Sequence, residues 1–364
     1  MKGSHQRRRD RLRKLIRRHG ADAMLVSNVI NVTYLTGFTG DSSYLLLTPT
    51  DQVVLSDPRY TTQLEEQCPG MDLEIRRPGE KITTSVAKAV KATGCRHLAI
   101  EAGSMTLAMF ELMKREVASV DWVSTSGLVE QLREIKDRAE VAEIRIAVAL
   151  AERVFEVIRA SLRPEQTEKE IGDAIEHQIR LFGGQGCSFV PIVAVGDRAA
   201  LAHYRPGLRR VEESNLLLID WGAYGQLYLS DLTRVLITGR PTAKLKRVFD
   251  LVLAAQRAGI QAIRPGALMK DVDRAARKVI EDAGFGKQFG HSLGHGIGLE
   301  IHEQPRLATD QARPLQSGMV LTVEPGVYIP GWGGIRIEDD VLVTRSGCEV
   351  LSRLPKEFAE CLVG

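Results

Sequence analysis

Two stretches, Leu216-Leu217-Leu218-Ile219-Asp220 and Met319-Val320-Leu321-Thr322-Val323-Glu324, indicate how the second half of this chain folds. Each is an apolar run that ends in an acid, and a glycine, Gly222 or Gly326, follows two residues later. Runs of Leu, Ile and Val bounded in this way are typical of buried strands. A carboxylate at the end of such a strand is costly to bury unless something compensates its charge.

The sequence around these two strands repeats. A second acidic strand follows each of them, Ser230-Asp231-Leu232-Thr233-Arg234 after the first and Ile335-Arg336-Ile337-Glu338-Asp339 after the second. Upstream, Arg163-Pro164 and Arg264-Pro265 interrupt two helical patterns at positions 101 residues apart. The period is too long for a solenoid repeat. The pattern predicts an internal duplication, with two similar halves around a pseudo-two-fold axis and their acids at the shared centre.

The four acids of these strands, Asp220, Asp231, Glu324 and Glu338, form two matched pairs. A single strand-end carboxylate could simply reach water. Four of them in matched positions favour a shared cation, because coordination removes the penalty of burying the charges.

Three of the eight histidines, His291, His295 and His302, lie in the glycine-rich stretch 289–303. Its glycines exclude a regular helix, so the two-histidine helical zinc motif does not apply. We expect one histidine to bind metal and the others to bind substrate or transfer protons. Carboxylates with one imidazole suit Mn, Co, Fe or Zn. Two such ions, about 3.5–4 Å apart, would lower the pKa of bound water towards 7, which suits hydrolysis of an amide or of a phosphate ester.

The first part of the chain alternates short apolar runs with amphipathic segments, which predicts an α/β domain. The expected strands are 23–26, 44–47, 53–55, 73–75 and 98–100, and the expected helices are 7–19, 59–67, 81–92 and 107–117. The composition becomes strongly charged near residues 131–138, and a long helical pattern follows. We therefore predict an N-terminal domain of residues 1–131 and a catalytic domain of residues 132–364.

The bulk composition is that of a globular protein, with 364 residues, 44% hydrophobic, 26% charged and a net charge of +3. No apolar run is long enough to span a bilayer, and no secretory signal pattern is present, so we expect a cytoplasmic protein with neither a membrane nor nucleic acid as partner. Five widely spaced cysteines argue against a disulfide framework. The basic segment Arg7–Arg18 is interpreted as a solvated helix face, with an anion-binding arm as the alternative.

Several motifs together resemble the creatinase/aminopeptidase ("pita-bread") superfamily, and within it the Xaa-Pro aminopeptidases and Xaa-Pro dipeptidases (prolidases). In the second half they are Ala202-His203-Tyr204-Arg205-Pro206, Asp220-Trp221-Gly222-Ala223-Tyr224, Ser230–Arg234, His291–Glu303, Val323-Glu324-Pro325-Gly326 and Gly334–Asp339. In the first half they are Tyr34-Leu35-Thr36-Gly37-Phe38 and Ser56-Asp57-Pro58-Arg59-Tyr60. The resemblance implies an α/β N-terminal domain followed by an α+β pita-bread catalytic domain.

The resemblance also assigns residue roles. It implies two divalent metal ions, with Mn expected and Co or Zn as alternatives, held by Asp220, Asp231, His295, Glu324 and Glu338. Glu324 would also accept a proton from the attacking water, while His203 and His302 would contact substrate and steady the tetrahedral intermediate. His291 would line the proline pocket, and Arg336 and Tyr328 would orient the peptide. For Arg336, a purely structural ion pair is the alternative.

The same resemblance implies a homodimer acting on short peptides with proline in second position, with the N-terminal domain limiting access to the site. Trp221, Leu229 and Pro191 depart from the usual pattern and are expected to reshape a pocket wall.

Creatine amidinohydrolase, methionine aminopeptidase and a non-catalytic peptide-binding module are the rival functions. The complete set of metal ligands disfavours the amidinohydrolase, which works without metal. The long N-terminal domain disfavours methionine aminopeptidase, and the retained ligands and histidines disfavour a non-catalytic module. Of the two Xaa-Pro activities we favour the aminopeptidase over the dipeptidase.

Overall fold

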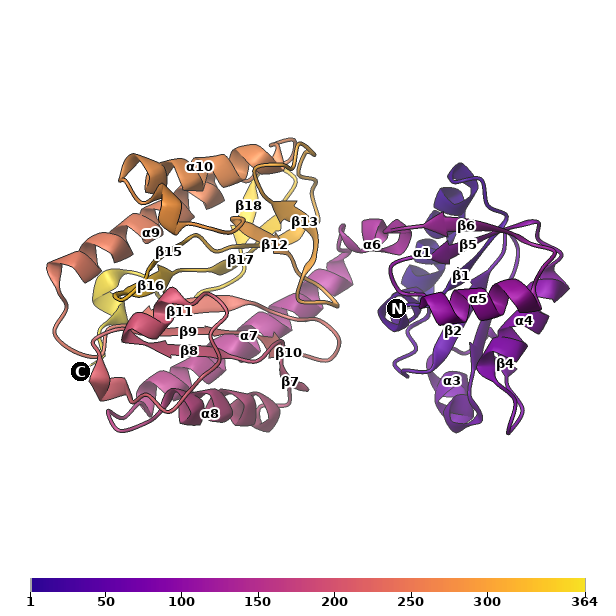
Figure 1. The fold of residues 1–364 in the computed structure, drawn as a ribbon, viewed down its shortest axis with the longest axis horizontal. Helices are drawn as coiled ribbons and strands as arrows, with labels where there is room; N and C mark the ends of the chain where they lie inside the picture. The colour runs from indigo at the N-terminus through magenta and orange to yellow at the C-terminus, as the bar shows by residue number, and fades with distance from the viewer. Residues whose placement is uncertain (1, 364) are drawn as a thin grey trace. The chain divides into compact units, whose positions relative to one another are not determined.

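The computed structural model describes residues 2–363 and divides into two compact units, Met1–Arg133 and Glu134–Gly364 (Figure 1). Each unit has its own hydrophobic core. Within the described range, no helix combines the length and the apolar character that crossing a bilayer requires.

The first unit is a six-stranded sheet covered by helices, as expected for an α/β domain. The strand order is β4-β3-β2-β1-β5-β6, and only β2 runs antiparallel to its neighbours. The strands are β1 (Ala23–Val26), β2 (Ser43–Leu47), β3 (Gln52–Ser56), β4 (Asp72–Ile75), β5 (His97–Glu101) and β6 (Asp121–Thr125). The helices are α1 (Lys2–Arg18), α2 (Val29–Thr36), α3 (Thr61–Gln67), α4 (Ile82–Thr93), α5 (Leu107–Glu116) and α6 (Leu128–Arg133).

The sequence analysis located five of these strands and four of these helices but missed α2, β6 and α6. Helix α2 is short and largely buried, so it lacks a clear amphipathic period. Its ends are fixed by local chemistry instead. The side chain of Asn28 accepts hydrogen bonds from the first amides of the helix, and Gly37 takes a left-handed conformation (φ 85°) that ends it.

Helix α1 corrects the interpretation of the basic segment as a solvated face. Arg8, Arg9 and Arg13 are buried, and their guanidinium groups donate to the backbone carbonyls of Tyr34, Leu35 and Thr48, respectively. These arginines therefore hold α1 against the rest of its own unit, and only the outward-facing basic residues of the helix are solvated.

The second unit begins with two helices and a small antiparallel sheet. Helix α7 (Arg138–Ala160) starts at a capping box on Asp137, and α8 (Glu168–Leu181) starts at one on Thr167. The strands that follow are β7 (Gly186–Cys187), β8 (Ile192–Val195), β9 (Leu217–Trp221), β10 (Ala223–Tyr224) and β11 (Leu232–Leu236). The main sheet has the order β11-β9-β8, and β10 pairs with β7.

In the remainder of this unit, two helices again precede the strands. Helices α9 (Ala243–Ala262) and α10 (Met269–Asp282) precede β12 (Gly294–Gly296), β13 (Glu303–Leu307), β14 (Val320–Val323), β15 (Gly326–Ile329), β16 (Gly333–Arg336), β17 (Asp339–Val343) and β18 (Cys348–Val350). The five-stranded sheet has the order β13-β12-β14-β17-β18. Figure 1 shows α7 and α8 on one side of the unit's strands, with α9 and α10 on the other.

Candidate metal centre

The side-chain alternation of strand β9 directs Asp220 away from the first helix pair. Leu217 and Ile219 belong to the core cluster that packs with α7 and α8, and Trp221 joins them. Leu218 contributes to the opposite cluster instead. Because successive side chains of a strand point to opposite faces, Asp220 lies on the Leu218 face, towards the inside of the unit.

Strand β14 places its acid in the complementary way. Leu321 and Val323 pack in the cluster that includes α9 and α10, so Thr322 and Glu324 point to the other face. The register of β14 with β17 ends with the pair Val323–Asp339, and Glu324 and Glu338 are the residues that adjoin this pair in the two chain segments. In the first sheet, Thr233 of β11 is paired directly with Asp220, and Asp231 lies two residues from Thr233 on the same face.

These strands converge on a compact group of donor atoms. His295 Nε2 lies 3.6 Å from Asp231 Oδ2 and 3.3 Å from Glu324 Oε1. One potential ligand atom from each of Asp231, His295 and Glu338 lies within 4.8 Å of the others. Asp220 is joined to this group through Thr233 and Arg336.

The protonation chemistry of this group fits a divalent cation. Burial raises the pKa of Asp231 and of Glu338 well above the ordinary value, and the neighbouring carboxylates raise both further. Burial also raises the pKa of Glu324 to about 8, whereas it lowers the pKa of His295 to about 4. Without a cation the carboxylates are driven towards their neutral forms, and the imidazole is ready to act as a neutral ligand.

Unpaired oxygen atoms support the same fit. Among the described residues, Asp220 Oδ1 and Glu338 Oε1 are fully buried and have no hydrogen-bond partner. Buried carboxylate oxygens are normally paired, so two orphans facing one cluster indicate missing positive charge. Four carboxylates and one imidazole, with no thiolate, form an oxygen-rich donor set typical of Mn or Co and also accessible to Zn. Two-metal sites built from such donors supply a water-derived nucleophile at neutral pH.

Arg336 connects the acids to the residues expected to bind peptide. Its Nε donates to Thr233 Oγ1 (3.1 Å), its second nitrogen to Tyr328 Oη (2.7 Å), and its third forms an ion pair with Asp220. Tyr328 Oη also lies 2.9 Å from His291 Nε2. The structure therefore brings His291, Tyr328 and Arg336 together as one hydrogen-bonded row.

The two remaining predicted histidines are solvent-exposed and lie beside the cluster. The ring of His302 packs edge-on to that of His295, with centroids 4.4 Å apart. Burial raises the pKa of Asp220 and Arg336 opposes the rise, and His203 also lies within electrostatic range of this carboxyl group. All ten predicted site residues are thus in one region of the second unit.

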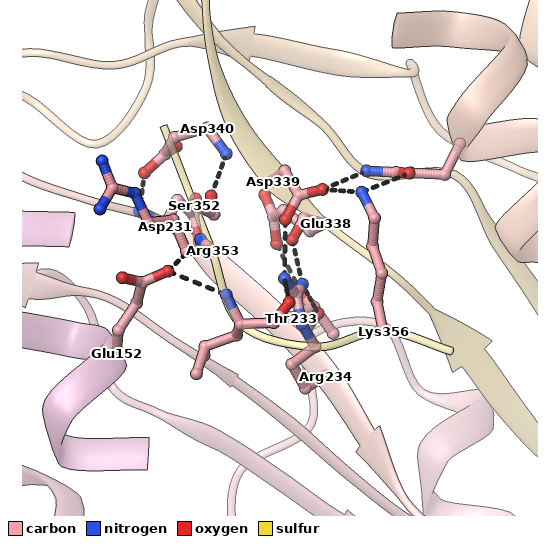
Figure 2. A network of polar contacts seen from close by, with 12 residues as sticks. Glu152, Asp231, Thr233, Arg234, Glu338, Asp339, Asp340, Ser352, Arg353 and Lys356 are labelled. Atoms are coloured by element: carbon pink, nitrogen blue, oxygen red, sulfur yellow. Dashed lines mark hydrogen bonds and ion pairs between the residues drawn. The ribbon is translucent and has the colours of Figure 1, made fainter. Parts of the chain in front are cut away.

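Sequence reasoning missed Asp340, which lies behind the cluster. Asp340 is buried, its Oδ2 accepts from the backbone amide of Asp231 (3.1 Å), and its own amide donates to Ser352 Oγ (2.9 Å). Figure 2 shows this contact on one side of the network. The run Glu338-Asp339-Asp340 was the only available signal, and it does not say which acid faces which way.

The other side of Figure 2 is a buried ion-pair network around Asp339. Arg234 bonds the Asp339 carboxylate at 2.7 Å and the backbone carbonyls of Glu338 and Leu354. Lys356 and Gln256 bond the second oxygen of Asp339. Although burial raises the pKa of Asp339, Arg234 and Lys356 outweigh it, and the net shift is downward. Asp339 is therefore an ionised structural acid, in contrast to its neighbours on either side.

Trp221 does not line the pocket, contrary to the expectation from sequence. Its indole is fully buried, stacks on Phe155 at 4.7 Å and donates to the carbonyl of Ala151 on α7. The alternation of β9 that turns Asp220 inward turns Trp221 towards α7, so this departure from the usual pattern changes the core. Leu229 and Pro191 are also buried, and for them an effect on the pocket stays a prediction.

Comparison with known proteins agrees with this geometry. Residues 142–345 match the model for metallopeptidase family M24, and residues 8–135 match the creatinase/prolidase N-terminal domain. The chain belongs to metallopeptidase family M24. Its pita-bread-type catalytic unit and its family membership establish it as a metallo-exopeptidase.

Several M24 relatives cover almost the whole chain. The Xaa-Pro dipeptidase of Pyrococcus furiosus is 32% identical over 96% of this chain and 99% of its own length. The solved structure of an Xaa-Pro dipeptidase from Bacillus anthracis is 38% identical, with a TM-score of 0.94, and covers 97% of this chain and 99% of that one. The X-Pro aminopeptidase of Thermotoga maritima is 35% identical with a TM-score of 0.88, covering 96% and 99%, respectively.

Proposed function

We propose that this M24 enzyme hydrolyses the peptide bond between an N-terminal residue and a following proline, as an Xaa-Pro aminopeptidase. The observation that carries the proposal is the convergence of Asp231, His295 and Glu338 within 4.8 Å, with Glu324 a further 3.3 Å from the imidazole. Together with Asp220, these residues would hold two divalent metals. When bound, such a metal pair supplies an activated water and polarises a carbonyl.

The other steps fall to side chains of this chain. Glu324 would accept a proton from the attacking water and return it to the leaving nitrogen. Its carboxylate is aligned for this by Thr322 Oγ1, which donates to Oε1 at 3.1 Å. His203 and His302 would donate hydrogen bonds to the oxygen on which negative charge develops. His291 and Tyr328, whose polar atoms are joined at 2.9 Å, would form one wall of the proline pocket.

The preference for chains longer than a dipeptide is supported by Arg336. Three of its five N–H groups are already engaged by Thr233, Tyr328 and Asp220, which leaves only two to bind the free carboxylate of a dipeptide. The second candidate is an Xaa-Pro dipeptidase with the same mechanism. It is favoured by the relatives, among which the Bacillus anthracis and Pyrococcus furiosus proteins both carry that name.

Manganese as the native metal, a homodimer and a cytoplasmic location complete the proposal. Manganese is supported by the oxygen-rich donor set. The dimer and the location rest on the family resemblance and on composition.

The test is hydrolysis of Ala-Pro and of Ala-Pro-Ala by metal-stripped protein reloaded with Mn or Co. Cleavage of the tripeptide at a rate equal to or above that of the dipeptide supports the aminopeptidase. Cleavage of the dipeptide alone identifies a dipeptidase, and Ala-Ala-Ala serves as the control for the requirement for proline. No cleavage of either proline peptide with any metal would contradict both forms of the proposal.

A further inference from the structure

Glu168 is a fully buried acid in the first turn of α8, and its side-chain hydrogen bonds go to none of the predicted metal ligands. One of its oxygens accepts from the backbone amide of Val195 at 2.8 Å. The other accepts from Tyr204 Oη at 2.8 Å and from the backbone amide of Gly207 at 2.9 Å. A buried carboxylate that accepts three hydrogen bonds stabilises the fold, because each of the three buried donors would otherwise have neither water nor a protein acceptor.

The three donors all belong to the path of the chain that carries His203. Val195 ends β8 and leads into the 3-10 turn Gly196–Ala200, while Tyr204 and Gly207 lie one and four residues after His203. Two further backbone bonds fix the far end of this loop to α8, from Lys169 N to Gly207 O and from Glu168 N to Arg209 O, both 2.9 Å. His203 itself is exposed, so it depends on its neighbours for its position.

We propose that Glu168 is the positioning residue for His203, acting through Tyr204 and Gly207. The inference rests on the proposed function only in giving His203 its contact with substrate. The ring of Tyr204 packs against the core, and its hydroxyl reaches Glu168, so the residue next to His203 is held at both ends of its side chain. Gly207 lies so close that a Cβ there would meet Tyr204 Oη at 2.8 Å and Glu168 Oε2 at 3.3 Å.

Replacing Glu168 should affect the loop that carries His203 without changing the metal ligands. Glu168→Gln keeps the shape but presents an amide N–H₂ to donors that need an acceptor, so at least one of the three bonds is lost. The predicted metal ligands lie on β9 and β12, just before β11, just after β14 and between β16 and β17, and Glu168 bonds none of these residues. Glu168→Gln should therefore loosen the loop that carries His203 and lower kcat, while the metal content stays at the wild-type level. Misplacing a catalytic group by about 1 Å costs up to about 100-fold in rate.

The experiment compares Glu168→Gln with Glu170→Gln in the Mn-loaded enzyme. Glu170 is an exposed acid of the same helix turn, and among the described residues its side-chain hydrogen bonds go to Thr167 alone. We expect kcat on Ala-Pro-Ala to fall at least about tenfold in Glu168→Gln and less than about twofold in Glu170→Gln. In a His203→Ala background, Glu168→Gln should cost less than about twofold more, because residues that act through one another are not additive.

Hydrogen exchange gives a second readout that does not depend on activity. Glu168→Gln should speed exchange at residues 201–207 and leave β9 and β14 unchanged, whereas Glu170→Gln should affect only the start of α8. Fully multiplicative effects of Glu168→Gln and His203→Ala, loss of metal, or unchanged exchange in the loop would each overturn the inference. If Glu168→Gln does not fold, Tyr204→Phe removes one donor while keeping the ring, and should show the same loop exchange and non-additivity at smaller size. A wild-type enzyme that cleaves no proline peptide refutes the proposed function, and the exchange comparison then still decides whether Glu168 holds the loop.

Discussion

The carboxylate of Asp340 accepts a 3.1 Å hydrogen bond from the backbone amide of Asp231. Asp340 is fully buried, and its other carboxyl oxygen has no hydrogen-bond partner among the described residues. The bond to the amide of Asp231 is therefore the main polar interaction of its side chain. Its effect is to fix the backbone just before β11 and thereby the carboxylate of Asp231 beside His295.

Removing this support should weaken metal binding. We expect Asp340→Ala to lower metal affinity by about 10- to 100-fold, as is usual when a partner that orients a ligand is lost. Asp340→Asn keeps an acceptor and should lose less. Competition with a fluorescent chelator measures the affinity, and Asp310→Asn, an exposed acid of the same unit, is the control. An Asp340→Ala protein with wild-type affinity would show that Asp231 holds its position without help.

Metal binding should release protons at neutral pH. The pKa of Glu324 lies at about 8 in the metal-free fold, so this carboxyl is mostly protonated at pH 7 and must ionise to bind metal. Affinity should therefore rise with pH through the range around 8. Calorimetric titration at pH 7 in buffers of different ionisation enthalpy gives the number of protons released. A value of zero would mean that the carboxylates are already ionised in the metal-free protein.

The stability of the metal-free protein should fall as the pH rises from 7 to 9. The folded-state pKa of Glu324, about 8, is above its ordinary value of 4.5, so the native state keeps a proton that the unfolded state has lost. Stability then decreases with pH through this range. His295, with its pKa lowered to about 4, is neutral in both states there and does not contribute. Thermal unfolding should show a drop of about 3 °C, which Glu324→Gln reduces.

The strongest sequence signals were those in which local pattern and chemistry coincide. Asp220 and Glu324 stand out because an apolar run that ends in an acid is visible without any structure, and the strand alternation explains why both turn inward. Asp340 was missed because three consecutive acids alternate in direction, and only the pairing of β14 with β17 shows which one faces the ligands.

Tertiary contacts between distant residues set the limit of the sequence analysis. Glu168 and Tyr204 are 36 positions apart, and nothing in the local pattern of α8 distinguishes Glu168 from the solvated acids beside it. For the same reason, the sequence pattern around Arg8, Arg9 and Arg13 predicts a solvated helix face. Their partners are backbone carbonyls of α2 and of the β2–β3 turn. Because every residue has a backbone carbonyl, the sequence does not indicate which of them accepts a hydrogen bond from an arginine.

Glu324→Gln should abolish turnover while the fold persists. The substitution removes both a metal ligand and the carboxylate proposed to accept the proton of the attacking water, and general-base loss alone costs about 10²–10⁴ in rate. Turnover of Ala-Pro-Ala at saturating Mn measures the effect, with metal content determined on the same sample. Glu349→Gln, which breaks only an exposed ion pair with Arg145, is the control and should retain full activity. Near-normal turnover in Glu324→Gln would require another base.

The ion pair of Arg234 with Asp339 should contribute to stability far more than an exposed pair does. Both side chains are almost fully buried, so Arg234→Met leaves Asp339 with Lys356 and Gln256 alone and frees the carbonyls of Glu338 and Leu354. Removing one partner of a buried pair costs about 3–5 kcal/mol in the free energy of unfolding. Arg145→Met breaks an exposed pair with Glu349 and should cost less than about 1 kcal/mol.

Urea denaturation of the metal-free variants makes this comparison without interference from metal binding. Because Arg234 also bonds the carbonyl of Glu338, Arg234→Met should weaken metal binding in addition, whereas Arg145→Met should not. Equal stability losses in the two variants would show that desolvation cancels the attraction in the Arg234 pair. A large stability loss with unchanged metal affinity would separate the two roles, leaving Arg234 a purely structural residue.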